Sequence, residues 1–393
     1  MRADYFRRAL NNPRPRTRAS SSHRASTTNA IAQDSCSGIR EMASSQSTAW
    51  VVAVVAAAGA ALAAADPGSQ PFAFLIPDVR IDAADRVRLD AYKPIVKLLP
   101  AANRELGVVA AVRLDAPPQR LIAWTRQIEA LQQGRYVPVI SRFSDPPQFD
   151  DLAGLNLDPG DVRDLEKCRP GKCGVKLGGL EIERLRAQVT PAASPQAVQQ
   201  EFRRIVLERA QRYLADGDVG LPPYYDDDEP VAAETEVATL LARLGLYAPH
   251  LPGLADYVQW FPRVTNPHVV DSFLYWATES LGPKPIASVT HVALLRGNGG
   301  DASTTLAVSK QVFASHYRDG AMSMTAITGS GRQRYLVYVH RSHLDVFQGP
   351  FGGFVRSIIE RRIQKEAPAV LTKLRARLEE GDPPQGGVHG HAQ

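Results

Sequence analysis

A lysine and a histidine interrupt an otherwise apolar strand face in the C-terminal half of the chain. Side chains alternate between the two faces of a strand. In residues 304–317, one face carries Leu306, Val308, Lys310, Val312, Ala314 and His316, and the other carries Thr305, Ala307, Ser309, Gln311, Phe313, Ser315 and Tyr317. Burying a lysine ammonium is costly unless it is paired. Lys310 therefore lies at the sheet edge or meets a partner or a ligand.

A second histidine, His291, lies in a neighbouring predicted strand beside apolar residues. An apolar pocket with a few converging polar groups is typical of small-molecule sites. We therefore predict a pocket around His291, Lys310 and His316. Gln311, Tyr317 and Arg341 are weaker members of this predicted set. The alternative is that all six are ordinary core or edge residues.

Enzymatic use of the same residues is a second hypothesis. His316 or His291 would act as the general base, and Lys310 would stabilise developing negative charge. The sequence contains no G-x-S-x-G, H-E-x-x-H, phosphate-binding loop or dinucleotide fingerprint. His340 and His343 are three residues apart in a predicted strand and so do not share a face. The acidic run 226–229 favours a solvated loop over a calcium site, and we predict neither a metal nor a cofactor.

The net charge of +5 belongs to the N-terminal leader. Residues 1–41 hold eight arginines and three acidic residues, and the rest of the chain is balanced. This argues against a nucleic-acid partner, because a basic patch is the electrostatic footprint of such binding. The apolar run 50–65 ends in Ala63-Ala64-Ala65, which is typical of an export signal. We expect cleavage near Ala65 and a periplasmic or extracellular protein. The alternatives are a membrane anchor formed by residues 50–65 and an organellar transit peptide.

Cys168 and Cys173 are the only cysteines that remain after such cleavage. An even count in an exported chain favours a disulfide. The Pro-Gly turn between the two cysteines could bring the sulfurs together, whereas two thiols alone cannot complete a tetrahedral zinc site.

Hydrophobic periodicity places these residues in an α+β domain. We expect a basic, disordered leader with its signal over residues 1–65, a single domain over 66–380 and a disordered tail over 381–393. Within the domain we expect strands at 95–99, 106–114 and 136–143, a helix after Pro118, a mostly helical insertion at about 180–262, strands at 286–295, 304–317, 321–328 and 335–343, and a long helix at 351–379.

This order resembles the helix-grip fold of the START and polyketide-cyclase-like superfamily. The resemblance implies a curved antiparallel sheet packed on a long C-terminal helix. The chain is also similar to a group of exported bacterial proteins of unassigned function. That resemblance lies in three segments, which are Pro285-Ile-Ala-Ser-Val-Thr-His291, Ala307-Val-Ser-Lys-Gln-Val-Phe-Ala-Ser-His-Tyr317 and Tyr335-Leu-Val-Tyr-Val-His-Arg-Ser342.

Members of the superfamily share a cavity rather than a chemistry. The resemblance therefore implies binding of a lipid or other hydrophobic small molecule in a START-like cavity, with membrane contact only through the signal or anchor segment. One alternative is a hydrolase- or cyclase-like enzyme that uses the same pocket. Another is an envelope structural or interaction protein that works through its helical insertion.

Overall fold

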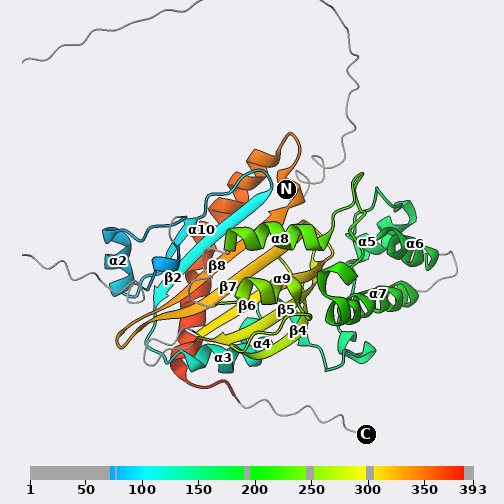
Figure 1. The fold of residues 1–393 in the computed structure, drawn as a ribbon. Coiled ribbons are helices and arrows are strands. Elements are labelled where there is room, and N and C mark those ends of the chain that lie inside the picture. Colours follow the sequence, from blue (N-terminus) through cyan, green and yellow to red (C-terminus); the bar gives the residue numbers. More distant parts are fainter. Residues whose placement is uncertain (1–70, 76–77, 190–194, 245–251, 298–304, 385–393) are drawn as a thin grey trace, which may run out of the picture. The chain divides into compact units, whose positions relative to one another are not determined.

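An eight-stranded antiparallel sheet forms the centre of the computed structural model (Figure 1). The model describes residues 71–75, 78–189, 195–244, 252–297 and 305–384, all within one compact unit. The predicted leader, signal and most of the tail lie outside these residues. The strand order is β1-β2-β8-β7-β6-β5-β4-β3. The strands are β1 (Ile95–Leu98), β2 (Glu105–Arg113), β3 (Val139–Arg142), β4 (Val269–Glu279), β5 (Ile286–Arg296), β6 (Thr305–Ala314), β7 (Arg318–Ser330) and β8 (Gln333–Leu344).

The sheet confirms the predicted α+β class and the predicted C-terminal strands. One strand, β4, was absent from the sequence-based assignment, although its Val, Phe, Tyr and Trp residues are typical of strands. The central strands are buried on both faces, so β5 and β6 are almost continuously apolar or small. That pattern arises when helices cover both sides of a sheet.

One face of the sheet packs against the N-terminal segment and two helices of the insertion. These helices are α8 (Ala233–Leu244) and α9 (Leu254–Trp260), which lie in front of the strands in Figure 1. Their apolar residues, including Leu240 and Val258, form one core with Leu306 and Val308 of β6. The short helix α2 (Ala83–Asp90) contributes Leu89 to the same core.

The opposite face packs against α3 (Gln119–Arg126), α4 (Ile128–Gln132) and the C-terminal helix α10 (Gly352–Glu380). Helix α10 lies behind the strands in Figure 1 and contributes Leu371 and Leu378 to the core of this face. The position of α10 confirms the predicted long C-terminal helix. The tail begins in contact with α3, where the Trp124 indole donates to the Gly381 carbonyl at 2.9 Å.

The insertion is larger than predicted and runs from residue 143 to residue 268, between the paired strands β3 and β4. It builds a second core against the ends of β4, β5 and β6. Its elements before α8 are η3 (Phe149–Leu152), α5 (Pro159–Asp164), η4 (Leu165–Lys167), α6 (Gly179–Ala187), α7 (Pro195–Asp216) and η5 (Gly217–Gly220). Cys168 and Cys173 form the predicted disulfide inside this segment.

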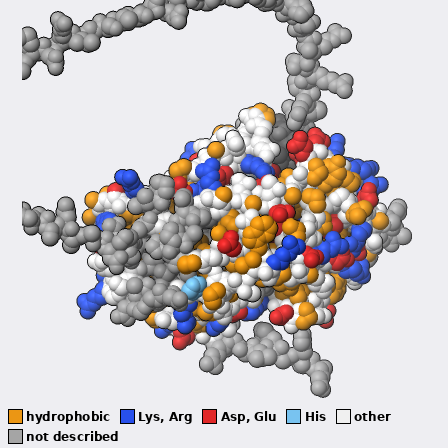
Figure 2. Space-filling view, in the orientation of Figure 1, with side chains coloured by type: hydrophobic (Ala, Val, Ile, Leu, Met, Phe, Trp, Pro, Cys, Tyr) orange, Lys and Arg blue, Asp and Glu red, His pale blue; other side chains and the backbone are white. Residues whose placement is uncertain are grey.

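The outer surface of the insertion is strongly charged near α6 and α7. Figure 2 shows blue and red side chains together at the end of the molecule where these helices lie. Arg184 of α6 pairs with Glu201 and Glu208 of α7, both at 2.7 Å. None of the helices in the described ranges is both long and apolar enough to cross a membrane.

Candidate functional site

A row of polar side chains crosses the sheet face that α10 covers. The strand registers bring them together, because Thr290 lies opposite Gln311, Ser323 opposite His340 and Thr325 opposite Tyr338. We call this set the polar row; it comprises Tyr275, Thr290, Ser309, Gln311, Ser323, Thr325, Tyr338 and His340. Six of the eight are half-buried rather than buried, so solvent reaches the middle of a sheet whose surroundings are core.

Helix α10 does not close tightly over the polar row. Its only fully buried residues are Gly352, Leu371 and Leu378, although every residue of the helix is described. A helix pressed onto a sheet would bury a stripe along its whole length. Between these residues the helix is held from the side, where Tyr136 donates its hydroxyl to Glu366 at 2.7 Å. No residue of α10 between Gly352 and Leu371 is buried, and Val355, Ile359 and Ile363 of this unsealed segment pack only partly on the β1 and β2 end of the sheet.

The groups of the polar row are uncharged at neutral pH. Burial, aided by the nearby Arg318 charge, lowers the pKa of His340 to about 4, so its imidazole is neutral. Burial raises the pKa of Tyr275 and the pKa of Tyr338, each to about 12, so both phenols keep their protons. Arg318 and Glu279 flank the row and neutralise each other through two hydrogen bonds of 2.7 and 3.0 Å.

Two buried polar atoms, one in the row and one beside it, have no hydrogen-bond partner among the described residues. They are Oε1 of Gln311 and Nε of Arg318. The Gln311 amide makes a single weak contact, from Nε2 to the Arg318 carbonyl at 3.4 Å. Unpaired buried polar atoms are rare in proteins, so these two mark the part of the row whose polar groups the fold itself does not satisfy.

Two of the predicted pocket residues, His291 and Lys310, face each other across β5 and β6, as the register predicts. They lie on the α8 and α9 face, away from α10, and both are buried. Lys310 donates from Nζ to Asp218 of η5 and to the Val258 carbonyl, both at 2.9 Å. The insertion thus supplies the partner that a buried lysine requires.

The hydrogen bonds of His291 do not favour its action as a general base. Its Nδ1 lies 2.6 Å from the Tyr213 hydroxyl, and its Nε2 lies 2.7 Å from Ser272 Oγ. The buried Tyr213 hydroxyl has no other acceptor among the described residues, so it donates to Nδ1 and leaves the imidazole proton on Nε2, pointing at the serine. Burial and the Lys310 charge also lower the pKa of His291 to about 3. A histidine that donates to the serine cannot take the serine's proton.

The other predicted residues lie apart from this pair. His316 is bonded to Asp161 at 2.8 Å, and the Tyr317 hydroxyl accepts from the Lys284 amide at 2.9 Å. Arg341 is fully buried and pairs with Asp78 and Glu105. Gln311 is the one member of the predicted set that belongs to the polar row. The structure thus brings His291 and Lys310 together and separates the rest, and a ligand-binding role for the six stays a prediction.

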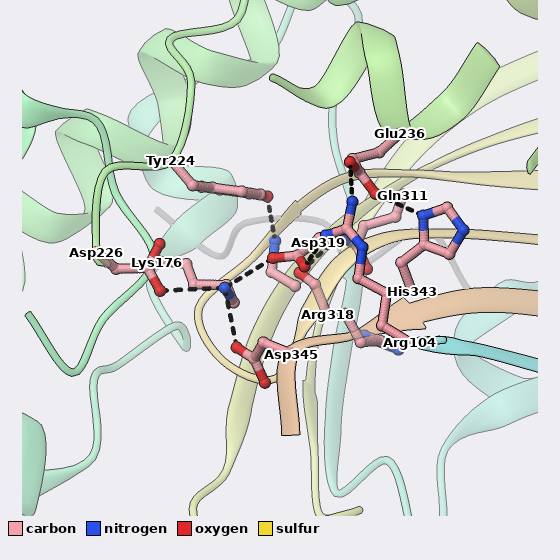
Figure 3. Close-up of polar contacts among 11 residues, drawn as sticks. Arg104, Lys176, Tyr224, Asp226, Glu236, Gln311, Arg318, Asp319, His343 and Asp345 are labelled. Atoms are coloured by element: carbon pink, nitrogen blue, oxygen red, sulfur yellow. Dashed lines mark hydrogen bonds and ion pairs between the residues drawn. The ribbon is translucent and has the colours of Figure 1, made fainter. Parts of the chain in front are cut away.

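An ionic network joins the insertion to the sheet (Figure 3). Lys176 donates to Asp226, Asp319 and Asp345 at 2.8–3.0 Å. Although burial opposes its charge, these three carboxylates raise the pKa of Lys176. Asp319 also pairs with Arg104, which reaches Glu236 of α8. Every charged group in this network has a partner, so its geometry serves to attach the insertion.

Comparison with known proteins adds little to this geometry. No protein-family model matches the chain, and no curated protein matches it. Among solved structures, it is similar to StfQ, a di-domain ARO/CYC from the steffimycin biosynthetic pathway, at 15% identity and a TM-score of 0.22. The alignment covers 49% of this chain and 62% of StfQ, less than two thirds of that chain's length. A TM-score this low does not establish a shared fold.

Most of the polar row escaped sequence reasoning. Ser309 and Gln311 stood on the less apolar face of their strand, and Gln311 was only a weaker candidate. The usable signal was the polar alternation Ser323, Thr325 in one strand and Tyr338, His340 in the next. Interior strands covered on both faces seldom carry such runs, because buried polar groups are costly without partners.

Proposed function

We propose that this protein binds a small, largely apolar molecule between the sheet and α10, in a START-like cavity. The observation that carries the proposal is the half-buried polar row beneath the unsealed part of α10. An apolar ligand there would exclude solvent from these side chains and would meet polar groups at a few defined points.

Apolar side chains adjoin the polar row on both sides. On the sheet side, the same face carries Phe273, Val292 and Leu336. On the helix side, Ile359 and Ile363 are only partly buried and pack toward β1 and β2. Apolar walls with a minority of polar groups are the usual lining of small-molecule sites.

The electrostatics favour an uncharged ligand. The row offers hydroxyl, amide and neutral imidazole groups, and its one ion pair is internally balanced. A charged ligand would lose its hydration without gaining a counter-charge, which is unfavourable in a water-poor site. We therefore expect hydroxyl or carbonyl groups on a hydrophobic skeleton.

Native mass spectrometry and organic extraction of protein purified from its own compartment test this proposal. We expect a bound hydrophobic molecule in the wild-type protein and its loss in Ser323→Phe, which places a ring over the row. The matched control is Ser330→Phe, on the exposed end of the same strand, which should retain the molecule. Absence of any bound molecule from the wild-type protein, or equal retention by both variants, would contradict the proposal.

We also propose that the protein is exported, with cleavage near Ala65. The support is the apolar run 50–65 and the balanced charge of the sequence after it. Sequencing the N-terminus of the mature protein tests this, and we expect it to begin near Asp66. Retention of residues 42–65 would instead favour a membrane anchor.

A further inference from the structure

A surface cleft of about 470 Å³ lies away from the polar row, where three segments meet. They are the end of α2, the end of β2 and the turn between β7 and β8. We call it the arginine cleft; it is lined by Tyr92, Arg113, Asp115, Gly331, Arg332 and Arg334. Three arginines and one aspartate therefore line a single hollow. The carboxylate, Asp115, already accepts a hydrogen bond from the Tyr92 hydroxyl.

Some N–H donors of the arginines in this cleft have no partner among the described residues. Arg113 uses one amino group on the Arg332 carbonyl at 3.0 Å and stands 3.7 Å from the exposed Asp90. Its Nε is buried and has no partner among the described residues, and the same holds for Nε of Arg334. Both side chains are thus incompletely partnered among the described residues, and because these Nε atoms are buried, the terminal guanidinium nitrogens are the donors that a ligand in the cleft would meet.

Tyr92 is held in the cleft against its backbone preference. It follows the last turn of α2 at a φ of 56°, a left-handed conformation that glycine adopts far more readily. Its ring is flanked by the guanidinium groups of Arg113 at 4.9 Å and Arg375 at 5.2 Å. A tyrosine at this position gives the cleft an aromatic wall that keeps Arg113 in place, which a glycine would not provide.

We propose that the arginine cleft binds the phosphoryl group of a ligand. Guanidinium groups recognise oxyanions through their planar array of N–H donors. A phosphoryl group presents three acceptor oxygens and carries about two negative charges, so it matches a cluster of several arginines better than a singly charged carboxylate does. The cleft is larger than one phosphate, which leaves room for the molecule that carries it. The polar row takes no part in this site, so the phosphoryl proposal can be tested independently of the binding function proposed above.

The test uses the full chain and two phosphoryl probes at constant ionic strength. Calorimetry measures binding of inorganic pyrophosphate, and co-sedimentation measures binding to vesicles that contain phosphatidic acid. The decisive variant is Arg334→Gln, since the buried Nε of Arg334 bonds nothing in the described residues and its loss should not disturb folding. Arg263→Gln removes the same charge from an exposed position after α9 and serves as the control.

We expect saturable binding of at least one probe, weakened about tenfold or more by Arg334→Gln and unchanged by Arg263→Gln. Binding of pyrophosphate alone would identify a soluble phosphorylated molecule, and binding of vesicles alone would identify a lipid headgroup; either result supports the proposal. Two results would overturn it: no saturable binding of either probe to the wild-type protein, or equal affinity of the two variants.

Discussion

On the face of the sheet that α8 and α9 cover, Lys310 and His291 are buried and fully partnered. On the face that α10 crosses, Ser309 and its neighbours in the polar row are half-buried. Lys310 and Gln311 are consecutive residues of one strand, yet the first is bonded to two acceptors and the second keeps an unpaired oxygen. The insertion supplies partners for Lys310 and His291 on one face, whereas no residue of α10 bonds the Gln311 oxygen on the other. The costlier side chain, a lysine, thus lies on the face where a partner is provided, although Oδ1 of that partner, Asp218, is itself unpaired among the described residues.

The largest expected effect comes from removing the ammonium group of Lys310, which pairs with Asp218. Lys310→Met leaves Asp218 buried without its cation, and we expect a loss of about 3–5 kcal/mol in the free energy of unfolding. Denaturant titration measures it, with the exposed Lys365→Met as control. Replacing both partners, in Lys310→Met with Asp218→Leu, should recover most of the loss. A loss below about 1 kcal/mol in the single variant would mean that this face is not sealed as described.

Acid should lower the stability of the protein through His291, which lies on the face that α8 and α9 cover. Burial lowers the pKa of His291 to about 3, whereas the unfolded chain protonates it near 6.5. Between these values the unfolded state binds the extra proton, so stability is full above pH 6.5 and falls as the pH falls. At pH 5 this difference in protonation should lower the free energy of unfolding by about 2 kcal/mol relative to its value above pH 6.5. Unfolding titrations at pH 7 and pH 5 should show a smaller decrease for His291→Gln than for wild type. His268→Gln, which removes a half-buried histidine outside this pair, serves as the control.

Larger side chains should destabilise the two faces of the sheet by different amounts. Ala293→Phe places a ring in the sealed core beneath α8 and α9, and such overpacking costs about 1–3 kcal/mol. Ser323→Phe adds a ring to the α10 face, where we expect a cost below about 1 kcal/mol because the space is open. Thermal unfolding of the two variants measures the difference. Equal destabilisation would show that α10 packs as closely as the insertion helices do.

The smallest effect is expected at Gln311. Its Oε1 is unpaired, so Gln311→Met removes a desolvated polar atom and should change stability by less than about 1 kcal/mol, in either direction. The measurement is denaturant unfolding of ligand-free protein. A loss above about 2 kcal/mol would reveal a hydrogen bond that the unliganded geometry does not contain.

The sequence predicted the positions of strands and helices better than it predicted which of them contact each other. Alternation separated the two faces of β6 correctly as far as Gln311, but a bulge against β5 then places Phe313 on the insertion side together with Val312, which alternation did not predict. The apolar stripe of residues 351–379 located α10. Alternation does not say which face a distant helix covers. Nor does it say that Asp218, 92 positions before Lys310, supplies the counter-charge. Pairings of that kind depend on the path of the insertion, which local periodicity does not encode.

The insertion also determines how the molecule can fold. Its two ends join strands that pair directly with each other, so it could be taken for an optional module on a complete sheet. However, Asp218 neutralises Lys310, Tyr213 satisfies His291, and Lys176 satisfies Asp319. A sheet without the insertion would therefore expose unpaired polar groups on what is now a buried face. Sheet and insertion should accordingly unfold in one cooperative transition, and neither half should persist as a stable intermediate.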